Sequence, residues 1–499
     1  MIPLIPLALF ILAFYLIYHY VISPYYLSPL SSIPNAHLTS PLSSYWIDGK
    51  RNAGTEVLAI YALHQKHGPI VRLGPKELSV NSIHGLKAIY SSAFEKHAWY
   101  NDVFVNFNTE NMVGMVHNAP HAHQKRMLSK AYSKSFLSQS SDLCTLSEVM
   151  LWDRLMPILK KAGENGEVLN VLPLFQALGM DFTSSFLLGS RRGTKFLLNI
   201  PEWMIWLKEY ERFKFMSRED RFMGFVEKWC LELCERAEPS EKKGTSSDDE
   251  KLPYTSPVIY DQLRQSLLAQ KEHDPRPLNL AIASELLDQL VAGHETTGIT
   301  LTYMSWELSR HPELQAELRK ELLSLSTSLR YPSTGGERPI PSPSDIDALP
   351  LLDSIVRETL RLYSPAPSQL PRVTPDTEKG TSLHGHDNIP GGVRVSSTAY
   401  SIHRIEEVYP RPLEWLPHRW LEAGDKIHDM RRLFWAFGSG GRMCLGSNFA
   451  LQEMKLVMAA VYSNYTTSII DDEDIEPDLA FISLPRGRKL MLKFTPVNE

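Results

Sequence analysis

The sequence is poor in cysteine, with only Cys144, Cys230, Cys234 and Cys444 among 499 residues. So few thiols argue against a disulfide framework and favour a reducing compartment. Cys230 and Cys234 lie one helical turn apart without a further ligand near them in the sequence, so we interpret them as packing residues. Blocks of positive charge are also lacking. With a formal net charge of −5, we expect no nucleic-acid partner.

Charge is missing from the amino terminus, where Ile2–Ile22 contains no Lys, Arg, Asp or Glu. At about 1.5 Å per residue in a helix, this run is just long enough for a hydrocarbon core of about 30 Å. A cleaved signal peptide would need a basic start, but the first Lys or Arg is Lys50. We therefore predict a retained transmembrane anchor over residues 1–23, with Lys50 and Arg51 favouring a cytoplasmic body.

The rest of the chain shows no internal repeat and divides by composition. Residues 24–50 are rich in proline and serine, which predicts a semi-rigid tether. Two polar segments, 238–251 and 324–344, are typical of surface loops and set off no unit able to fold alone. We expect residues 51–499 to form one catalytic domain.

Hydrophobic periodicity predicts mostly helices. Residues 69–81 indicate two short strands around a Gly-Pro turn, and the pattern from 119 to 235 is mainly helical. A long helix is expected over 278–310, a second over 351–363, and a last one directly after Cys444. The predicted fold class is mainly α with a minor β part, an α+β protein.

The strongest chemical signal is Phe437–Gly446, FGSGGRMCLG. A thiolate that binds a metal needs a turn in which backbone N–H groups face the sulfur. Gly438, Gly440 and Gly441 can supply the unusual backbone angles of such a turn. The helix expected behind Cys444 would place its positive end near the anion.

Two side chains of this loop suit a haem. Arg442 offers a permanent cation for an acidic propionate group, and the ring of Phe437 could cover the macrocycle. Taken alone, a cysteine in a glycine-rich loop is more often a plain buried thiol. A phosphate-binding loop is excluded because no Gly-Lys-Ser/Thr follows.

The whole spacing resembles the ligand loop of the cytochrome P-450 family, Phe-x-x-Gly-x-Arg-x-Cys-x-Gly. Its fixed places are filled here by Phe437, Gly440, Arg442, Cys444 and Gly446. The resemblance implies a single large haem-binding domain of the cytochrome P-450 fold, with Cys444 as the axial ligand of the haem iron. Three further elements should then stand upstream in a set order.

The first element is a small-Gly-x-acid-Thr sequence on a long helix, present as Ala292, Gly293, Glu295 and Thr296. Oxygen activation needs protons at bound dioxygen in a pocket that is otherwise dry. We expect Gly293 to leave room for dioxygen, Thr296 to donate a hydrogen bond and Glu295 to relay protons. A zinc HExxH motif is excluded because Gly298 stands where its second histidine belongs.

The second element is Glu-x-x-Arg, present as Glu358 and Arg361, which share a helix face. Alone, the pair could be a weak exposed ion pair. In the family it locks to an arginine in a Pro-Glu-Arg-Phe-like stretch, which corresponds here to Arg419. We expect a structural triad of Glu358, Arg361 and Arg419, although His418 replaces the usual acid.

The third element, a Trp-x-x-x-Arg propionate contact, is atypical. His121 stands in place of the tryptophan and Lys125 in place of the arginine. Arg372 resembles a further propionate contact of the family. His117, His121 and His123 could suggest a metal site, but a proline among them breaks the helical face.

The resemblance implies a monooxygenase that inserts one atom of O2 into a hydrophobic small molecule, using heme b. Electrons are expected from NADPH through NADPH-cytochrome P-450 reductase, with cytochrome b5 as a further candidate partner. The anchor implies a single-pass protein of the endoplasmic reticulum membrane facing the cytoplasm. The chain is similar to filamentous-fungal members that serve secondary metabolite biosynthesis.

Two alternatives stay open. A haem-thiolate isomerase or dehydratase would act without a reductase, and a membrane haem-binding protein would not be an enzyme. Glu295 and Thr296 argue against both, because neither needs a proton relay.

Family position also implies a mostly apolar substrate pocket. Its predicted lining residues are Phe104, Phe107, Met112, Leu290, Ser368, Gln369, Leu370 and Ile482.

Overall fold

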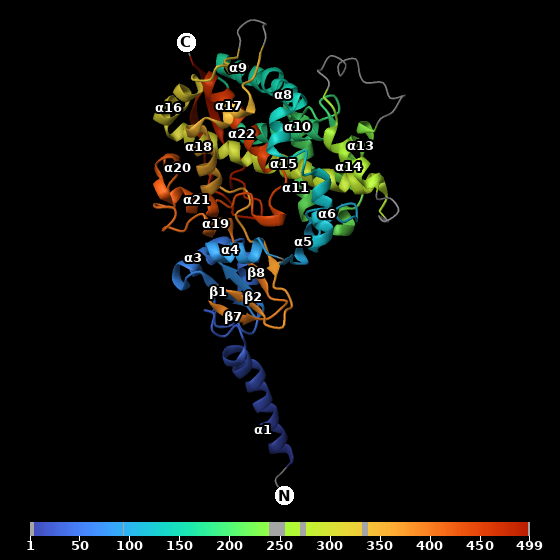
Figure 1. The fold of residues 1–499 in the computed structure, drawn as a ribbon, viewed down its shortest axis with the longest axis vertical. Helices are drawn as coiled ribbons and strands as arrows, with labels where there is room; N and C mark the ends of the chain where they lie inside the picture. Colours follow the sequence, from blue (N-terminus) through green and yellow to red (C-terminus); the bar gives the residue numbers. More distant parts are fainter. Residues whose placement is uncertain (1–3, 93, 239–254, 270–275, 332–337, 498–499) are drawn as a thin grey trace.

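The computed structural model describes residues 4–92, 94–238, 255–269, 276–331 and 338–497. Most of the predicted polar loop 238–251, and part of 324–344, lie outside these residues. A helical part, a β-rich part and a projecting amino-terminal helix follow one another along the long axis (Figure 1). The predicted mainly α fold with a minor β part is confirmed.

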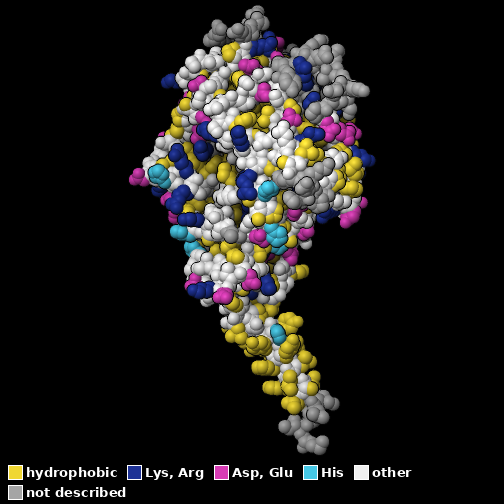
Figure 2. All heavy atoms as spheres, turned by 45° about the vertical axis from the view of Figure 1, so that its right-hand side comes forward, with side chains coloured by type: hydrophobic (Ala, Val, Ile, Leu, Met, Phe, Trp, Pro, Cys, Tyr) yellow, Lys and Arg dark blue, Asp and Glu magenta, His cyan; other side chains and the backbone are white. Residues whose placement is uncertain are grey.

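The amino terminus leaves the body as α1 (Leu4–Ile17), which continues as a π-helix (Tyr18–Leu27). Figure 2 shows its hydrophobic side chains standing free of the body. Pro6–Leu27 is long and apolar enough to cross a membrane and is not buried by protein, whereas Val171–Leu188, which meets the same criteria, is 94% buried. An unburied apolar helix of this length is compatible with a membrane anchor.

The segment expected as a tether lies against the body. Leu30 and Ile33 are buried in a core cluster with strand residues. The Ala36 N–H donates to the Arg72 carbonyl at 2.9 Å, and the Arg72 N–H donates to the Pro34 carbonyl at 2.8 Å. The chain between anchor and body therefore packs as an extra edge of the β-rich part.

That part is built on a five-stranded sheet in the order β1 (Ile70–Gly74), β2 (Glu77–Val80), β8 (Arg394–Ser396), β5 (Arg372–Val373) and β3 (Glu95–Lys96). The first two strands pair antiparallel, as their Gly-Pro turn predicted. Pairing of β3 with β5 sets two basic residues opposite each other.

Two smaller sheets complete the strands. One contains β4 (Val168–Asn170), β10 (Met491–Pro496) and β9 (Tyr465–Asp471), and the other contains β6 (Thr381–Leu383) and β7 (His386–Ile389).

The helical part is organised around α15 (Leu278–Arg310), which has the predicted bounds and packs on α10 (Val171–Leu188). The two helices cross closely because they meet at glycines. A Cβ added at Gly179 would lie 3.1 Å from the Gly293 carbonyl, and one at Gly298 would lie 2.6 Å from the Gln176 side chain. Only glycine permits this approach.

Two other predicted helices are α18 (Pro350–Leu362) and α22 (Ser447–Asn464). The remaining helices are α2 (Tyr45–Asn52), α3 (Glu56–His67), α4 (Ile83–Tyr90), α5 (Trp99–Phe104), α6 (Asn118–Leu128), α7 (Lys134–Gln139), α8 (Ser141–Glu148), a π-helix (Val149–Leu155), α9 (Met156–Asn165), α11 (Ile200–Phe215), α12 (Arg218–Arg221), α13 (Phe225–Ala237), α14 (Val258–Leu268), α16 (Pro312–Leu322), α17 (Pro343–Asp347), α19 (Ala399–Ile402), α20 (Arg419–Glu422) and α21 (Ile427–Leu433), with 3-10 turns at Phe196–Leu198, Gly424–Lys426 and Gly440–Arg442.

Helix α22 carries a buried acid, Glu453. Its side chain is 3% exposed, and neither carboxyl oxygen has a hydrogen-bond partner in the described part of the chain. Burial raises its pKa well above the ordinary value of 4.5. A group of this kind favours the unfolded state once that state ionises, so its contribution to stability falls as the pH rises above about 4.5.

We expect Glu453→Gln to melt at the same temperature as wild type near pH 4.5 and at a higher temperature at pH 8. The difference should reach about 1–3 kcal/mol in unfolding free energy, because the carboxylate must take up a proton on folding whereas the amide is neutral in both states. Thermal melts of both proteins across this pH range measure it. A difference that does not grow with pH would contradict the assignment.

Candidate active site

The loop before α22 is shaped by two glycines. Gly438 and Gly440 have φ values of 68° and 67°, and a Cβ at Gly440 would lie 2.0 Å from the Tyr90 carbonyl oxygen. Gly441, expected to share this backbone freedom, does not have a positive φ. Two left-handed residues are therefore enough to fold the loop back on itself.

Cys444 stands at the end of this loop. Its N–H donates to the Phe437 carbonyl at 2.9 Å, and the Gly446 N–H faces the sulfur. Helix α22 begins at Ser447, three residues after the cysteine rather than directly behind it. Surrounding protein raises the thiol pKa, while Gly446 and Lys125 act to lower it. The side chain is nonetheless exposed, which indicates that it borders an interior space.

The opposite wall of this space is one face of α15. Ala292 is exposed in the middle of a helix whose neighbouring turns are buried, and Thr296 one turn later is partly exposed. Tyr132 joins the two walls, because its ring lies 4.0 Å from the position of a Cβ on Gly446 and its hydroxyl donates to Gln289 on α15 at 2.5 Å. Tyr132 therefore connects the loop that carries Cys444 with α15, the helix that carries Ala292 and Thr296.

Five basic side chains gather beside this space: Lys96, His121, Lys125, Arg372 and Arg442. Lys96 lies directly opposite Arg372 in the β3–β5 pair. Burial, followed by the charges of its basic neighbours, lowers the pKa of Lys96 well below its usual range and that of His121 to about 3. Burial and then Arg372 lower the pKa of Arg442 to about 10.

The acids near this cluster act on it only through space: Asp288 acts to raise the pKa of Lys96, and Glu95 and Glu110 act to raise that of Arg442. Among the described residues, no carboxylate forms an ion pair with any of the four lysines and arginines of the cluster. Arg442 instead donates to the carbonyls of Met115 and Val116 at 2.7 and 2.8 Å, and Lys125 donates to that of Met443 at 2.7 Å. Gathered cations that have no ion-paired carboxylate in the described structure fit a group that brings two carboxylates, and the thiol fits its iron. The site therefore suits haem.

Lys96 was not predicted from the sequence. It lies in a two-residue strand, and no local pattern indicates that this strand pairs with the one that carries Arg372. Its Nζ donates to the Val113 carbonyl at 2.6 Å and lies 4.4 Å from the centre of the Tyr100 ring.

The acid and alcohol of α15 face different surroundings. The Thr296 hydroxyl donates to the Ala292 carbonyl at 2.8 Å, on the face that borders the interior space. Glu295 is buried and turned toward α11, where it accepts hydrogen bonds from Tyr210 at 3.0 Å and Lys214 at 2.9 Å. The two side chains are adjacent in sequence but point about 100° apart on the helix.

The structure explains the glycine at position 293 differently from the sequence-based expectation. A Cβ there would lie 2.2 Å from the Thr183 hydroxyl of α10, so helix packing requires the glycine. Room for dioxygen does not explain this requirement, and a contact between Gly293 and dioxygen stays a prediction.

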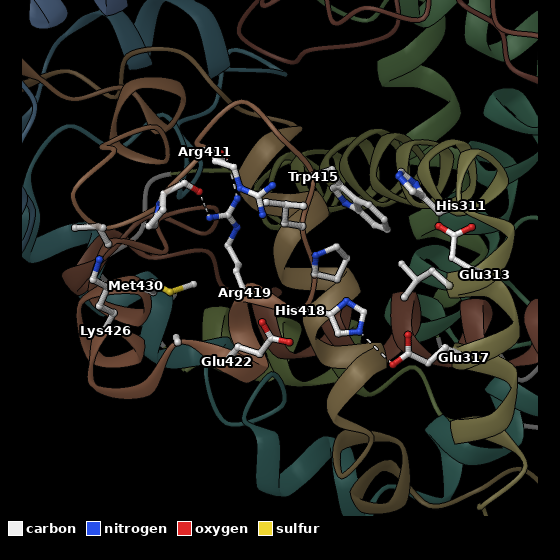
Figure 3. Close-up of a pocket in the computed structure, with 16 residues that line it drawn as sticks. His311, Glu313, Glu317, Arg411, Trp415, His418, Arg419, Glu422, Lys426 and Met430 are labelled. Carbon is white, nitrogen blue, oxygen red and sulfur yellow. Dashed lines mark hydrogen bonds and ion pairs between the residues drawn. The ribbon is translucent and has the colours of Figure 1, made fainter.

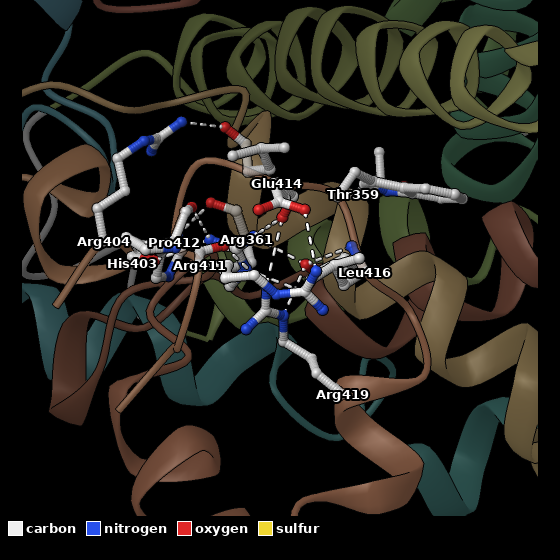
Figure 4. Close-up of polar contacts among 12 residues, drawn as sticks. Thr359, Arg361, His403, Arg404, Arg411, Pro412, Glu414, Leu416 and Arg419 are labelled. Carbon is white, nitrogen blue, oxygen red and sulfur yellow. Dashed lines mark hydrogen bonds and ion pairs between the residues drawn. The ribbon is translucent and has the colours of Figure 1, made fainter. Parts of the chain in front are cut away.

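Arg361 and Arg419 both form ion pairs with the Glu358 carboxylate. Figure 4 shows the two arginines close together among the backbone segments around Pro412 and Glu414. Arg361 is fully buried and makes five hydrogen bonds, two of them to the Glu358 carboxylate at 2.8 and 2.9 Å. The other three go to the backbone carbonyls of His403, Pro412 and Glu414. Arg419 reaches Glu358 at 2.9 Å. The triad fastens α18 to the chain that leads to Cys444.

His418, which replaces the usual acid, forms an exposed contact of 3.1 Å with Glu317 on α16. Both residues line a surface pocket of about 440 Å³ between α16 and α20 (Figure 3). The pocket is bordered by Arg419, on the outer side of the triad, and neither Cys444 nor Thr296 lines it. We assign it no part in the chemistry.

We expect Arg361→Leu to cost about 3–5 kcal/mol, because it leaves the Glu358 carboxylate buried and removes its closest charge partner. Arg411→Leu serves as the control. Arg411 lies in the segment whose carbonyls Arg361 binds, and its side chain forms only an exposed contact with Glu414 in the described structure. Melting temperature and the yield of haem-loaded protein measure the effect. Equal losses in the two variants would contradict a special role for the triad.

The predicted apolar lining residues lie in different surroundings. Phe104 is partly exposed in a ring cluster with Trp99 and Phe481, while Phe107 and Leu290 are buried in the main core. Met112 is buried, and its N–H donates to a Glu285 oxygen.

The residues predicted between 368 and 482 are also mostly covered. Gln369 is buried and accepts a hydrogen bond from Arg51 at 3.2 Å, and Ser368 is buried beside it. Leu370 and Ile482 are partly buried against the two core clusters. Contact of all eight predicted lining residues with a substrate stays a prediction.

The family model described as Cytochrome P450 matches residues 43–492. The chain belongs to the cytochrome P450 family. It is therefore a haem-dependent monooxygenase that uses dioxygen, electrons from NAD(P)H delivered by a redox partner, and a hydrophobic substrate.

Similar proteins come from fungi. The cytochrome P450 monooxygenase orf2 of Aspergillus niger is 25% identical over 92% of this chain and 93% of its own. FGM1 of Gibberella zeae, also named a cytochrome P450 monooxygenase, is 27% identical over 86% of each chain. The fusicoccadiene C-8 hydroxylase of Alternaria brassicicola is 28% identical over 87% of this chain and 84% of its own. These names favour neither the reductase-independent isomerase nor the non-enzymatic haem protein.

Proposed function

We propose that Cys444 is the axial ligand of heme b, and that Glu295 and Thr296 deliver protons to dioxygen bound between α15 and the haem. The observation that carries this proposal is the Cys444 thiol, which is accessible although protein surrounds it, beside basic residues that form no ion pair with a carboxylate in the described structure. Haem held there would supply the oxidising chemistry, with thiolate donation favouring O–O cleavage.

The protein's own groups bind and orient the cofactor. Lys96, Lys125, Arg372 and Arg442 would share the two propionates, with His121 as a neutral hydrogen-bond donor because its pKa is lowered to about 3. The atypical His121 and Lys125 are thus compensated by Lys96, which adds a cation from the sheet.

On the other side of the space, α15 separates two environments. Thr296 faces the interior, and Glu295 lies on the side of α11. A proton taken up by the Glu295 carboxylate would be passed on to the side of α15 on which Thr296 lies. Tight packing of α10 against the same helix keeps other water out.

The partners and location follow from the anchor and the relatives. We infer a single-pass protein of the endoplasmic reticulum, facing the cytoplasm, supplied by NADPH-cytochrome P-450 reductase and assisted by cytochrome b5. The apolar helix Pro6–Leu27 and the Lys50–Arg51 pair support this placement. The fungal relatives, one of them named as a hydroxylase, support oxidation of a hydrophobic small molecule in secondary metabolism.

We expect the reduced wild-type protein to give with carbon monoxide the absorption band typical of a thiolate-ligated haem. Cys444→Ala should lose that band, because an alanine offers no ligand. Cys230→Ala, which removes a buried thiol far from Cys444 in the sequence, should keep the band. A wild-type protein that is folded and haem-loaded but lacks the band would refute thiolate ligation.

We also expect Glu295→Gln and Thr296→Ala to slow the full reduction of dioxygen to water about 10- to 100-fold, since general acid catalysis commonly contributes at least this much. The assay uses full-length protein in liposomes with the reductase and NADPH, and compares dioxygen consumed with peroxide recovered. Thr297→Ala, a buried neighbour, is the control. Unchanged rates in both test variants, or activity without the reductase, would contradict the proposal.

A further inference from the structure

A row of aromatic rings leads from Glu295 toward the surface. Tyr210 on α11 donates its O–H to Glu295 at 3.0 Å, and its ring stacks on that of Trp206, one helical turn back, with centres 5.2 Å apart. The Trp206 ring in turn lies 4.9 Å, centre to centre, from that of Trp229 on α13. Tyr210 and Trp206 are buried, whereas Trp229 is partly exposed. The row therefore connects the acid of α15 with solvent.

Two indole N–H groups in this cluster are unpaired. Trp203 and Trp206 are 0% and 2% exposed, and neither Nε1 has a hydrogen-bond partner in the part of the chain that the structure describes. Buried donors are nearly always paired, so an unpaired donor needs an explanation, and a redox role is one such explanation. An indole that has lost an electron tends to give up its N–H proton as well. Without an acceptor at Nε1, the oxidised Trp206 ring would keep its proton and take an electron back easily.

Tyr210 has the opposite arrangement. Burial, and then the Glu295 carboxylate, raise the pKa of Tyr210 well above its ordinary value of 10, so the phenol keeps its proton at neutral pH. A phenol loses an electron easily only if its proton can leave at the same time. Glu295 Oε2 accepts the Tyr210 hydrogen bond and can receive that proton. Tyr210 is therefore suited to begin an electron path, and Trp206 to continue it.

We propose that Tyr210, Trp206 and Trp229 form an electron path that protects the protein when dioxygen is activated but no substrate is oxidised. An oxidising equivalent left in the site then takes an electron from Tyr210, whose proton moves to Glu295. Trp206 gives an electron to Tyr210, which recovers its proton, and Trp229 gives an electron to Trp206. This inference rests on the proposed activation of dioxygen beside Cys444.

A thiol in the surrounding solution completes the path by giving an electron to the partly exposed Trp229. Two thiols that each lose one electron join as a disulfide and release two protons. The two electrons consume the two oxidising equivalents that remain once the O–O bond has been cleaved. The two protons balance those needed for the remaining oxygen atom to leave as water. Electrons and protons therefore balance without a further reactant.

The competing explanation is that the rings only fill the core between α11, α13 and α15. Large aromatic side chains bury much apolar area, so packing alone gives a reason for their presence. Packing does not depend on how easily a ring loses an electron, and phenylalanine would serve nearly as well. The two explanations therefore differ in what happens to the rings under oxidation.

The test adds peracetic acid, without reductase or organic substrate, to haem-loaded full-length protein in liposomes. Freeze-quench electron paramagnetic resonance detects protein radicals, and mass spectrometry then locates the oxidised ring. We expect wild type to show a tryptophan radical and oxidation at Trp229. Tyr210→Phe, Trp206→Phe and Trp229→Phe should lose this radical, because phenylalanine gives up an electron far less readily. These variants should also lose haem absorbance faster, and the thiol glutathione should slow that loss in wild type only.

Trp152→Phe is the matched control. Trp152 is also buried with an unpaired Nε1, but its ring contact in the described structure is with Tyr331, at 6.0 Å between centres. If the three path variants match this control in radical signal and in haem loss, the inference is overturned. Oxidation located at other rings instead of Trp229 overturns it as well.

The carbon monoxide spectrum separates this inference from the proposed function. Each variant is first shown to give the band typical of a thiolate-ligated haem. A folded, haem-loaded wild type without the band would refute the ligation by Cys444, and the electron path would fall with it. A normal band together with radicals that do not depend on Trp206 and Trp229 would refute the path alone.

Discussion

The close crossing of α10 and α15 is the constraint on which the active site depends. Gly179, Gly293 and Gly298 let the two helices touch along their backbones, so one side of α15 is sealed. The opposite side, with Ala292 and Thr296, is then left to border the interior space. Because a helix cannot turn about its axis once one face is locked, this packing decides which side chains of α15 border the interior space.

A second constraint is electrostatic. A fold rarely gathers four lysines and arginines without pairing any of them with a carboxylate, because like charges repel and burial penalises each one. The lowered pKa values of Lys96 and Arg442 measure this cost. A dianionic cofactor removes it, so cofactor binding and folding stabilise each other. The triad of Glu358, Arg361 and Arg419 shows the contrasting case, in which buried charge is balanced within the chain.

Much of this site could be predicted from sequence, because its key motifs are local. Each motif lies within a short stretch of sequence. These stretches are Phe437–Gly446, the helix turn with Glu295 and Thr296, and the pair Glu358 and Arg361. The helix 278–310 followed from periodicity alone.

What the sequence did not indicate depends on pairings between distant segments. Lys96 joins the basic cluster only because its strand pairs with that of Arg372. Lys214 reaches Glu295 only because α11 packs beside α15. The true reason for Gly293 also lies on another helix, at Thr183. Register and helix packing are set by the whole core, so no window of sequence contains them.

The join between anchor and body also depends on contacts between distant segments of the chain. Arg72 on β1 is buried and donates to the carbonyl of Pro24, inside the π-helix that ends the apolar span, and to the carbonyls of Gly74 and Pro75. Leu30 and Ile33 pack into the sheet just beyond it. A proline-rich composition suggested a spacer, but a spacer cannot bury apolar side chains. In an anchored protein, this fastening fixes the distance and tilt between the membrane and the β-rich part. Since β3 and β5 of that part hold Lys96 and Arg372, the same contacts also fix the place of these two basic residues relative to the anchor helix.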